Sequence, residues 1–179
     1  MENWYWKYDS AVNADQCAEI IKMGDGQWRS GKVDTENGNA EVGPGRSSDV
    51  VFVNDRSVYE LLEQFVLDAN DNAGWRYELT AAQPIQLARY KVNEFYDHHL
   101  DSIGSHFDPR PRKLSLCVAL NDDYDGGKFD FTSPSGLAEE EIATGTVIVF
   151  PSFLFHHVSP VTRGVRYSLV GWYTGPPFK

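Results

Sequence analysis

The stretch FPSFLFHHVSPVTRGVRYSLVGW, Phe150–Trp172, contains two short apolar, strand-like runs. Pro160 and Gly164 lie between them, and both residue types favour turns. The same alternation of short runs and turn residues extends over residues 84–179. The runs are PIQLARY, KLSLCVAL, GKFDFTS, GTVIVF, FLFHHV and RYSLVGWY. Short strands without intervening helices predict an all-β sandwich or a closed double-sheet roll rather than a Rossmann-like fold.

Residues 1–83 are expected to form a scaffold of helices and strands. Asn13 or Asp15 is placed to cap a short helix that ends near Gly24, because either side chain can accept hydrogen bonds from the first free backbone amides. Residues 34–48 are rich in Gly, Asn and Ser, so we expect a loop there.

A longer helix is expected after the strand-like run DVVFV, Asp49–Val53. Ser57 and Glu60 have the spacing of a capping box, which predicts that the helix begins close to Ser57. The apolar residues that follow recur at three- and four-residue spacing: Tyr59, Leu61, Leu62, Phe65, Val66 and Ala69. They define one apolar face, and we expect that face to pack on a sheet.

The composition indicates one globular domain, residues 1–179, without internal repeats. Sixteen basic and 26 acidic side chains give a net charge of −10, which repels phosphate backbones and argues against a nucleic-acid partner. Cys17 and Cys117 stand in apolar surroundings and are interpreted as small core residues. No signal-peptide pattern or membrane span is visible, so we expect no membrane partner and a cytoplasmic location.

The tripeptide His99-Leu100-Asp101 is a candidate metal-binding pair. Residues two apart on an extended strand point to the same side, so the imidazole and the carboxylate can reach a common point. A third ligand must come from a distant strand, where His156 and His157 are the candidates. Two histidines and one carboxylate leave one face of an octahedral iron open. His-x-Asp alone is a weak signal, since a polar surface pair gives the same pattern.

A cationic anchor follows the second histidine pair. Arg166 comes ten residues after His156, and Ser168 faces the same side of the expected strand. A guanidinium and a hydroxyl suit the capture of a carboxylate. Taken alone, Arg166 is better explained as a surface salt bridge, but beside metal ligands it indicates a site for a dicarboxylic oxo-acid.

Three groups of residues occur here in the order and spacing of a known family. They are Tyr90, Tyr96, His99 and Asp101, then RKLSLCVALNDDYDGGKFDF (residues 112–131), and finally Phe150, Pro151, Ser152, His156, Pro160, Val161, Gly164, Arg166 and Trp172. With them, the region from about Ile85 to Trp172 resembles the prolyl 4-hydroxylase branch of the 2-oxoglutarate oxygenases, including the PKHD-type hydroxylases. Asn93 stands where that family usually has Gly, but Asn tolerates a positive φ, so the turn can still form.

The resemblance implies a double-stranded β-helix, or jelly roll, over residues 84–179 with N-terminal helices packed on one sheet. It implies an Fe(II)- and 2-oxoglutarate-dependent dioxygenase that consumes O2 and uses ascorbate to keep its iron reduced. His99, Asp101 and His156 then hold the iron. Tyr90 and Arg166 bind the distal carboxylate of 2-oxoglutarate, the one farther from its keto group.

Three other histidines are weighed against this assignment. The family's spacing selects His156, and His157 and His98 are expected to point to the opposite strand faces from the ligands. His106 and Asp108 form a second His-x-Asp pair in a Gly- and Pro-rich run. We interpret that pair as a loop at the substrate entrance.

The resemblance favours a prolyl residue of a protein or peptide as the substrate, hydroxylated at its 4-position. Tyr96 and Trp172 are expected to form an aromatic wall for the proline ring, although Trp172 is explained equally well as a core residue. The loops 38–48 and 102–112 are candidate substrate lids.

Two alternatives remain at this stage. One is hydroxylation of a free amino acid or other small molecule, whose charged group could be bound by Arg110, Arg112 or Lys128. The other is a non-catalytic β-helix module that acts by binding. Loss of a metal ligand or of the anchoring arginine would indicate such a module, but all four residues are present.

Overall fold

The structure is a computed structural model that describes residues 3–31, 33–34, 40–41, 43–102, 109–133, 136–139 and 142–178. In this part of the chain the helices are α1 (Ala14–Lys22) and α2 (Arg56–Asn72). The strands are β1 (Trp6–Tyr8), β2 (Arg29–Ser30), β3 (Val33–Asp34), β4 (Ala40–Glu41), β5 (Arg46–Ser47), β6 (Asp49–Val53), β7 (Ala81–Ala82), β8 (Ile85–Tyr90), β9 (Phe95–His99), β10 (Arg112–Ala119), β11 (Asp125–Gly126), β12 (Phe129–Ser133), β13 (Gly136–Glu139), β14 (Val147–Pro151), β15 (His156–Val158), β16 (Val161–Arg163) and β17 (Arg166–Thr174). The prediction of a mainly β chain is confirmed. Within the described ranges, no helix is long and apolar enough to cross a membrane.

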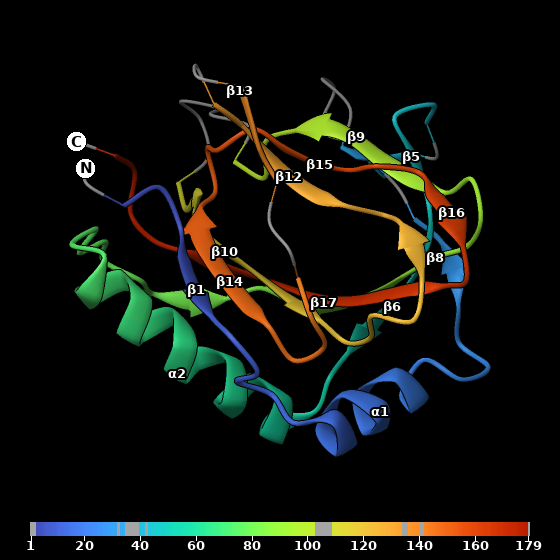
Figure 1. The fold of residues 1–179 in the computed structure, drawn as a ribbon. Helices are drawn as coiled ribbons and strands as arrows, with labels where there is room; N and C mark the ends of the chain where they lie inside the picture. The colour runs from blue at the N-terminus through green and yellow to red at the C-terminus, as the bar shows by residue number, and fades with distance from the viewer. Residues whose placement is uncertain are drawn as a thin grey trace.

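Two antiparallel sheets face each other (Figure 1). The large sheet has the order β1-β14-β10-β17-β8-β6-β2, with β7 also paired to β17. The small sheet has the order β13-β12-β15-β9-β5. Both helices lie on the side of the large sheet that is turned away from the small one (Figure 1). The two sheets therefore enclose a space that the helices do not enter.

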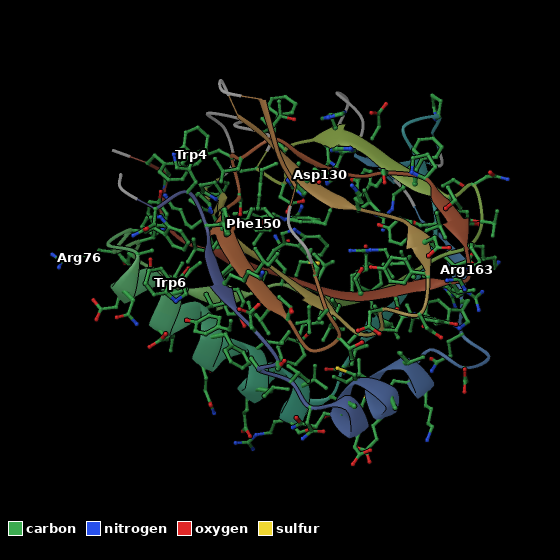
Figure 2. All side chains as sticks on the ribbon, in the orientation of Figure 1. Trp4, Trp6, Arg76, Asp130, Phe150 and Arg163 are labelled. Atoms are coloured by element: carbon green, nitrogen blue, oxygen red, sulfur yellow. The ribbon has the colours of Figure 1, made fainter. Side chains whose placement is uncertain are left out.

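Each face of the large sheet carries its own apolar core. On the helix side, α2 buries one face against alternate residues of the central strands: Val58, Leu62, Val66 and Ala69 pack with Leu87, Leu114, Leu116, Val118, Val147, Val149 and Leu169. Between the sheets the core is smaller and more aromatic: Val50, Ala88, Tyr90, Phe129, Phe131, Ile148, Phe150, Val158 and Val161. Figure 2 labels Phe150 in this second core. Because side chains alternate along a strand, one sheet can line both cores.

The start of α2 differs from the prediction. Its N-cap is Asp55, whose carboxylate accepts hydrogen bonds from the backbone amides of Ser57 and Val58. The capping box predicted at Ser57 and Glu60 is therefore wrong, and Glu60 instead pairs with Arg56 at 2.7 Å. An earlier carboxylate satisfies the free amides, so the helix begins one residue before Ser57.

The first helix begins at one of the two residues predicted as its N-cap. Asn13 is the N-cap of α1, and its side chain and that of Gln16 bond to each other's backbone amides as a capping box. The loop predicted for residues 34–48 is wrong in two places. Asp34 and Ala40–Glu41 belong to the paired strands β3 and β4, and Arg46–Ser47 pairs with β9 as the edge of the small sheet. Asn93 has a φ of 69°, so the turn expected at this position does form with Asn in place of Gly.

Candidate metal centre and co-substrate site

His99, Asp101 and His156 lie together at one side of the small sheet. His99 ends β9 and His156 begins β15, and the two are direct partners in the antiparallel pairing of these strands. Asp101 lies two residues beyond His99, past the end of the strand. The Nε2 atoms of His99 and His156 lie 3.7 and 3.6 Å from the Asp101 carboxylate. The structure thus brings together the three side chains selected from the sequence.

Backbone carbonyls orient both imidazoles. Nδ1 of His99 lies 2.7 Å from the carbonyl oxygen of Asp97, and Nδ1 of His156 lies 2.9 Å from that of Leu154. A carbonyl oxygen can only accept, so each Nδ1 carries the hydrogen and each Nε2 keeps a free lone pair. Outer contacts of this kind fix the tautomer and ring orientation of metal-binding histidines.

The charge states also suit a metal. Burial, with the neighbouring His156, lowers the pKa of His99 from 6.5 to about 4, so its imidazole is neutral at pH 7. Burial alone raises the pKa of Asp101, but His156, His99 and a hydrogen bond from Ser115 hold that pKa below its ordinary value. The site therefore offers a neutral imidazole at His99 and an anionic oxygen at Asp101.

The residues present fit a divalent iron. Oδ2 of Asp101 is buried, and among the described residues it has no hydrogen-bond partner. An unsatisfied buried carboxylate oxygen costs about 1–3 kcal/mol or more, which a cation beside it would offset. Two histidines and one carboxylate are the ligand set of non-haem Fe(II) oxygenases and leave positions open for other ligands.

Arg166 is a buried cation on the large sheet. Its side chain is only 2% exposed, and its Nη1 donates a hydrogen bond to Oγ of Ser168 at 2.9 Å. In the described part of the chain, Nε of Arg166 has no hydrogen-bond partner and no carboxylate pairs with the guanidinium. Tyr90 is the neighbour of Arg166 across the β8–β17 pair, with its ring centroid 5.4 Å from Cζ. A buried charge without an ionic partner is costly, so this position favours an anionic ligand.

Cys117 lies near both the guanidinium of Arg166 and the carboxylate of Asp101. It was interpreted as a small core residue, and it is buried. Burial raises the pKa of its thiol, while the charge of Arg166 opposes this shift and that of Asp101 adds to it. Tyr90, the cross-strand partner of Arg166, belongs to the same core between the sheets as Phe129 and Phe150, which pack against His156. Arg166 and the metal ligands therefore face the same interior.

A cavity of about 1110 Å³ adjoins the metal ligands His99 and Asp101. Its lining combines aromatic and cationic side chains: Trp28, Phe52, Tyr96, Trp172, Arg29, Arg46 and Arg112. Concave sites of this size that border reactive groups are the usual places for a substrate.

The two aromatic residues selected from the sequence both line this cavity. Tyr96 stacks on His99 with ring centroids 3.6 Å apart, and Cζ of Arg46 lies 4.5 Å from the Tyr96 centroid. Cζ of Arg112 lies 4.3 Å from the ring of Trp172. The indole nitrogen of Trp172 is buried, without a hydrogen-bond partner in the described ranges. By stacking on His99, Tyr96 also supports the ring of a metal ligand.

Several lining residues were not found from the sequence. Trp28 and Phe52 come from the N-terminal half, where no motif marks them. Arg46 is buried and donates hydrogen bonds to Oγ of Ser48 at 2.8 Å and to Oε1 of Gln86 at 2.7 Å. The only signal was an arginine inside a Gly- and Ser-rich segment, which by itself predicts a loop.

His98 and His157, the other histidines in the described part of the chain, are not among the metal ligands, although His98 lines the cavity beside them. His98 and His157 stack on each other with ring centroids 4.1 Å apart, and Nε2 of His157 lies 3.6 Å from the Asp130 carboxylate. Figure 2 labels Asp130 on the small sheet. Both histidines are thus directed away from the metal ligands, as expected from strand alternation. The second His-x-Asp pair, His106 and Asp108, lies outside the described residues.

Comparisons of the sequence with known proteins agree with this site. The model of the 2OG-Fe(II) oxygenase superfamily matches residues 85–174. The PKHD-type hydroxylase YbiX of Shigella dysenteriae is 31% identical over 166 residues, 84% of this chain and 69% of that protein. A PKHD-type hydroxylase of a Synechococcus species is 28% identical over 145 residues, 81% of this chain. The chain spans 65% of the Synechococcus protein and 40% of a further PKHD-type hydroxylase from Maricaulis maris.

Solved structures share the fold. A Pseudomonas putida prolyl-4-hydroxylase superposes with a TM-score of 0.77 at 20% identity, covering 99% of this chain and 95% of that one. A Trichoplax adhaerens prolyl hydroxylase, solved with a peptide fragment of hypoxia inducible factor, has a TM-score of 0.71 at 16% identity. The match covers 96% of this chain and 84% of that one.

Proposed function

Because the chain belongs to the 2OG-Fe(II) oxygenase superfamily, in the branch of the PKHD-type hydroxylases and prolyl 4-hydroxylases, we propose that it hydroxylates a prolyl residue of a protein or peptide at the 4-position. In this proposal the facing sheets are the two halves of a double-stranded β-helix, and ascorbate keeps the iron reduced. The observation that carries the proposal is the pairing of a His-Asp-His set with a buried arginine in one interior.

The protein's own residues hold and orient the reactants. His99 and His156 would hold the iron through Nε2 and Asp101 through a carboxylate oxygen, which would leave positions open for other ligands. Arg166 binds the distal carboxylate of 2-oxoglutarate, beside the hydroxyl of Tyr90. When bound, the iron supplies the oxygen chemistry, in which one atom of O2 enters succinate and the other becomes the hydroxyl group of the product.

Aromatic side chains keep water from the interior side of the metal ligands. The ring of His156 lies 4.8 Å from that of Phe150 and 5.5 Å from that of Phe129, measured between centroids. Tyr96 stacks on His99. An apolar surround strengthens the electrostatic contacts within the site and limits side reactions with solvent.

The substrate is proposed to enter through the 1110 Å³ cavity. In this proposal Trp172 and the edge of the Tyr96 ring contact the pyrrolidine ring, because Arg112 lies over the Trp172 ring and the Tyr96 ring is already in contact with His99 and Arg46. Arg112 and Arg46 line the same cavity. A peptide in polyproline conformation loses little entropy when it docks.

The test is mass spectrometry of proline-containing peptides incubated with enzyme, Fe(II), 2-oxoglutarate, ascorbate and O2. We expect one added oxygen on proline, equal in amount to the succinate formed, and co-elution of the hydrolysed product with 4-hydroxyproline. Trp172→Ala should lose the product but keep the metal. Oxidation of a free amino acid with coupled succinate, and of no peptide, would contradict the prolyl proposal.

A second candidate is hydroxylation of a small molecule that carries a carboxylate. It is favoured by the arginines of the cavity, which stand out in a chain of net charge −10. Of the three cations considered from the sequence, Arg112 lines this cavity and Lys128 lines a different one. Arg110 is exposed. Succinate release on a panel of free amino acids, with Arg112→Gln as the matched variant, separates the two candidates.

A further inference from the structure

Tyr124 lies against Arg166, the residue proposed to anchor 2-oxoglutarate. A Cβ built on Gly127 would lie 3.1 Å from the Tyr124 ring and 3.0 Å from Cδ of Arg166, so these side chains meet over this glycine. The Tyr124 phenol also interacts with the guanidinium: although burial lowers the pKa of Arg166, Tyr124 is among the groups that raise it above its ordinary value. A guanidinium can only donate, so the phenol oxygen accepts and its own hydrogen stays available for an anion.

The backbone around Tyr124 is fixed to the turn that precedes Arg166. The side chain of Asn121 donates to the carbonyl of Val165 at 2.7 Å and accepts from the amide of Tyr167 at 2.7 Å. A Cβ on Gly164 would lie 3.1 Å from Cα of Tyr124, which is a close approach of two backbones. The position of the phenol relative to Arg166 is therefore set by hydrogen bonds and packing on both sides.

Tyr124 also lines a second cavity of about 900 Å³, whose rim includes Lys7 and Asp122. Phe129 lines the same cavity, and its ring lies 5.5 Å from the ring of the metal ligand His156. Arg166 is not among the residues that line it in the described part of the chain. Tyr124 therefore stands between the anchoring arginine and an open space.

We propose that Tyr124 closes the distal end of the 2-oxoglutarate site. Its hydroxyl donates to the distal carboxylate beside Arg166, and its ring limits the oxo-acid to five carbons. This inference rests on the proposed role of Arg166. 2-Oxoadipate has one more methylene group, so with its keto group in the same place its distal carboxylate would reach the position of the phenol ring.

The experiment is calorimetric titration of the full chain with 2-oxoglutarate and with 2-oxoadipate, in the presence of Mn(II) and without O2. Wild type should bind 2-oxoglutarate more tightly than 2-oxoadipate. Tyr124→Phe keeps the wall but removes the donor, so its affinity for 2-oxoglutarate should fall about tenfold with the preference unchanged. Tyr124→Ala joins the site to the second cavity, so the preference for 2-oxoglutarate should fall at least about tenfold.

Two variants serve as controls. Tyr59→Phe removes the hydroxyl of a different tyrosine, which accepts a hydrogen bond from the backbone amide of Ile85 on the helix side of the large sheet. This variant should change neither the affinity for 2-oxoglutarate nor that for 2-oxoadipate. Lys128→Ala alters the lining of the second cavity but keeps the Tyr124 side chain, and it should keep the preference. If Tyr124→Ala does not fold, Tyr124→Leu, which shortens the wall, replaces it. An unchanged preference in folded Tyr124→Ala, or in the Tyr124→Leu that replaces it, overturns the inference, provided that the variant binds Mn(II). Failure of wild type to bind 2-oxoglutarate at all would overturn the proposed function instead.

Discussion

At the scale of single residues, the site depends on hydrogen bonds between the imidazoles of the metal ligands and the backbone. The carbonyls of Asp97 and Leu154 belong to residues two positions before His99 and His156. Each of the two segments thus supplies both the imidazole and the acceptor that fixes its tautomer, within β9 for His99 and just before β15 for His156. Because the contact is made by the backbone, changing the side chain of Asp97 or Leu154 does not remove it.

The first prediction concerns the ligands. His99→Ala or His156→Ala should weaken Fe(II) or Mn(II) binding by about a hundredfold or more and abolish coupled succinate release, since two ligands hold a labile divalent ion poorly. Calorimetry with Mn(II) measures the affinity. His98→Ala is the matched control, because His98 precedes a ligand but stacks on His157 instead. Equal losses in His98→Ala and His99→Ala would contradict the assignment.

The second prediction concerns the anchor. Arg166→Lys keeps the charge and loses the planar fork, so the affinity for 2-oxoglutarate should fall about 10- to 100-fold, or about 1.5–3 kcal/mol, while metal binding is retained. The affinity is measured by titrating the Mn(II)-loaded protein. Arg163→Lys is the control, because Arg163 forms an exposed pair with Asp125. An unchanged affinity in Arg166→Lys would remove this arginine from the site.

At the scale of secondary structure, the pairing of β9 with β15 decides the metal centre. Strand alternation predicted that His99 and Asp101 point to the same side, and the family's spacing selected His156. The direct pairing of His99 with His156 could not be read from either segment alone. Asp101 lies beyond the strand, so its approach to the histidines depends on the bend after Leu100 rather than on simple alternation. The run FLFHHV is paired in the small sheet only over His156–Val158, because a turn after Pro151 occupies its first residues.

The third prediction belongs to the β6–β8 pair. Asp49 accepts from both Arg89 and Lys91, at 2.6 and 2.7 Å. Although burial raises the pKa of Asp49, these cations lower it below its ordinary value. The stabilisation is therefore complete above about pH 4 and is lost as the pH falls through the lower folded pKa.

Asp49→Asn should cost about 1–2 kcal/mol of unfolding free energy at pH 7, and this difference should shrink below about pH 4. Urea unfolding at several pH values measures it. Asp125→Asn is the control, because its pair with Arg163 is exposed and is expected to contribute little. A difference between wild type and Asp49→Asn that persists at pH 2.5 would show that the ion pair is not its cause.

At the scale of the whole molecule, the sequence predicted the strands and ligands that carry local patterns. It missed features that depend on distant segments. Trp28 and Phe52 reach the cavity because β2 and β6 extend the large sheet past the metal ligands, and no periodicity in the first half indicates this. One local feature was missed as well: Asp55 was overlooked as the N-cap of α2 because Ser57 fits a common capping pattern two residues later.

The residues proposed to bind the metal and those proposed to bind the distal carboxylate of 2-oxoglutarate lie on different sheets. His99 and His156 are on the small sheet, whereas Arg166 is on the large one. A 2-oxoglutarate that contacts the metal at one end and Arg166 at the other would therefore connect the sheets. Metal alone would contact the small sheet and the segment just after it.

The fourth prediction follows from this division. Mn(II) alone should slow hydrogen exchange mainly in β9 and β15, and adding 2-oxoglutarate should extend the protection to β8 and β17. At 100 times its dissociation constant, 2-oxoglutarate should add about 2.7 kcal/mol of stability, which raises the Tm by about 5–10 °C for a chain of this size. Succinate, which lacks the keto oxygen, should add less. In Arg166→Lys the increment from Mn(II) should remain, and the one from 2-oxoglutarate should fall to about 0.4–1.4 kcal/mol at the same concentration. Protection confined to the small sheet in wild type would show that the co-substrate does not connect the sheets.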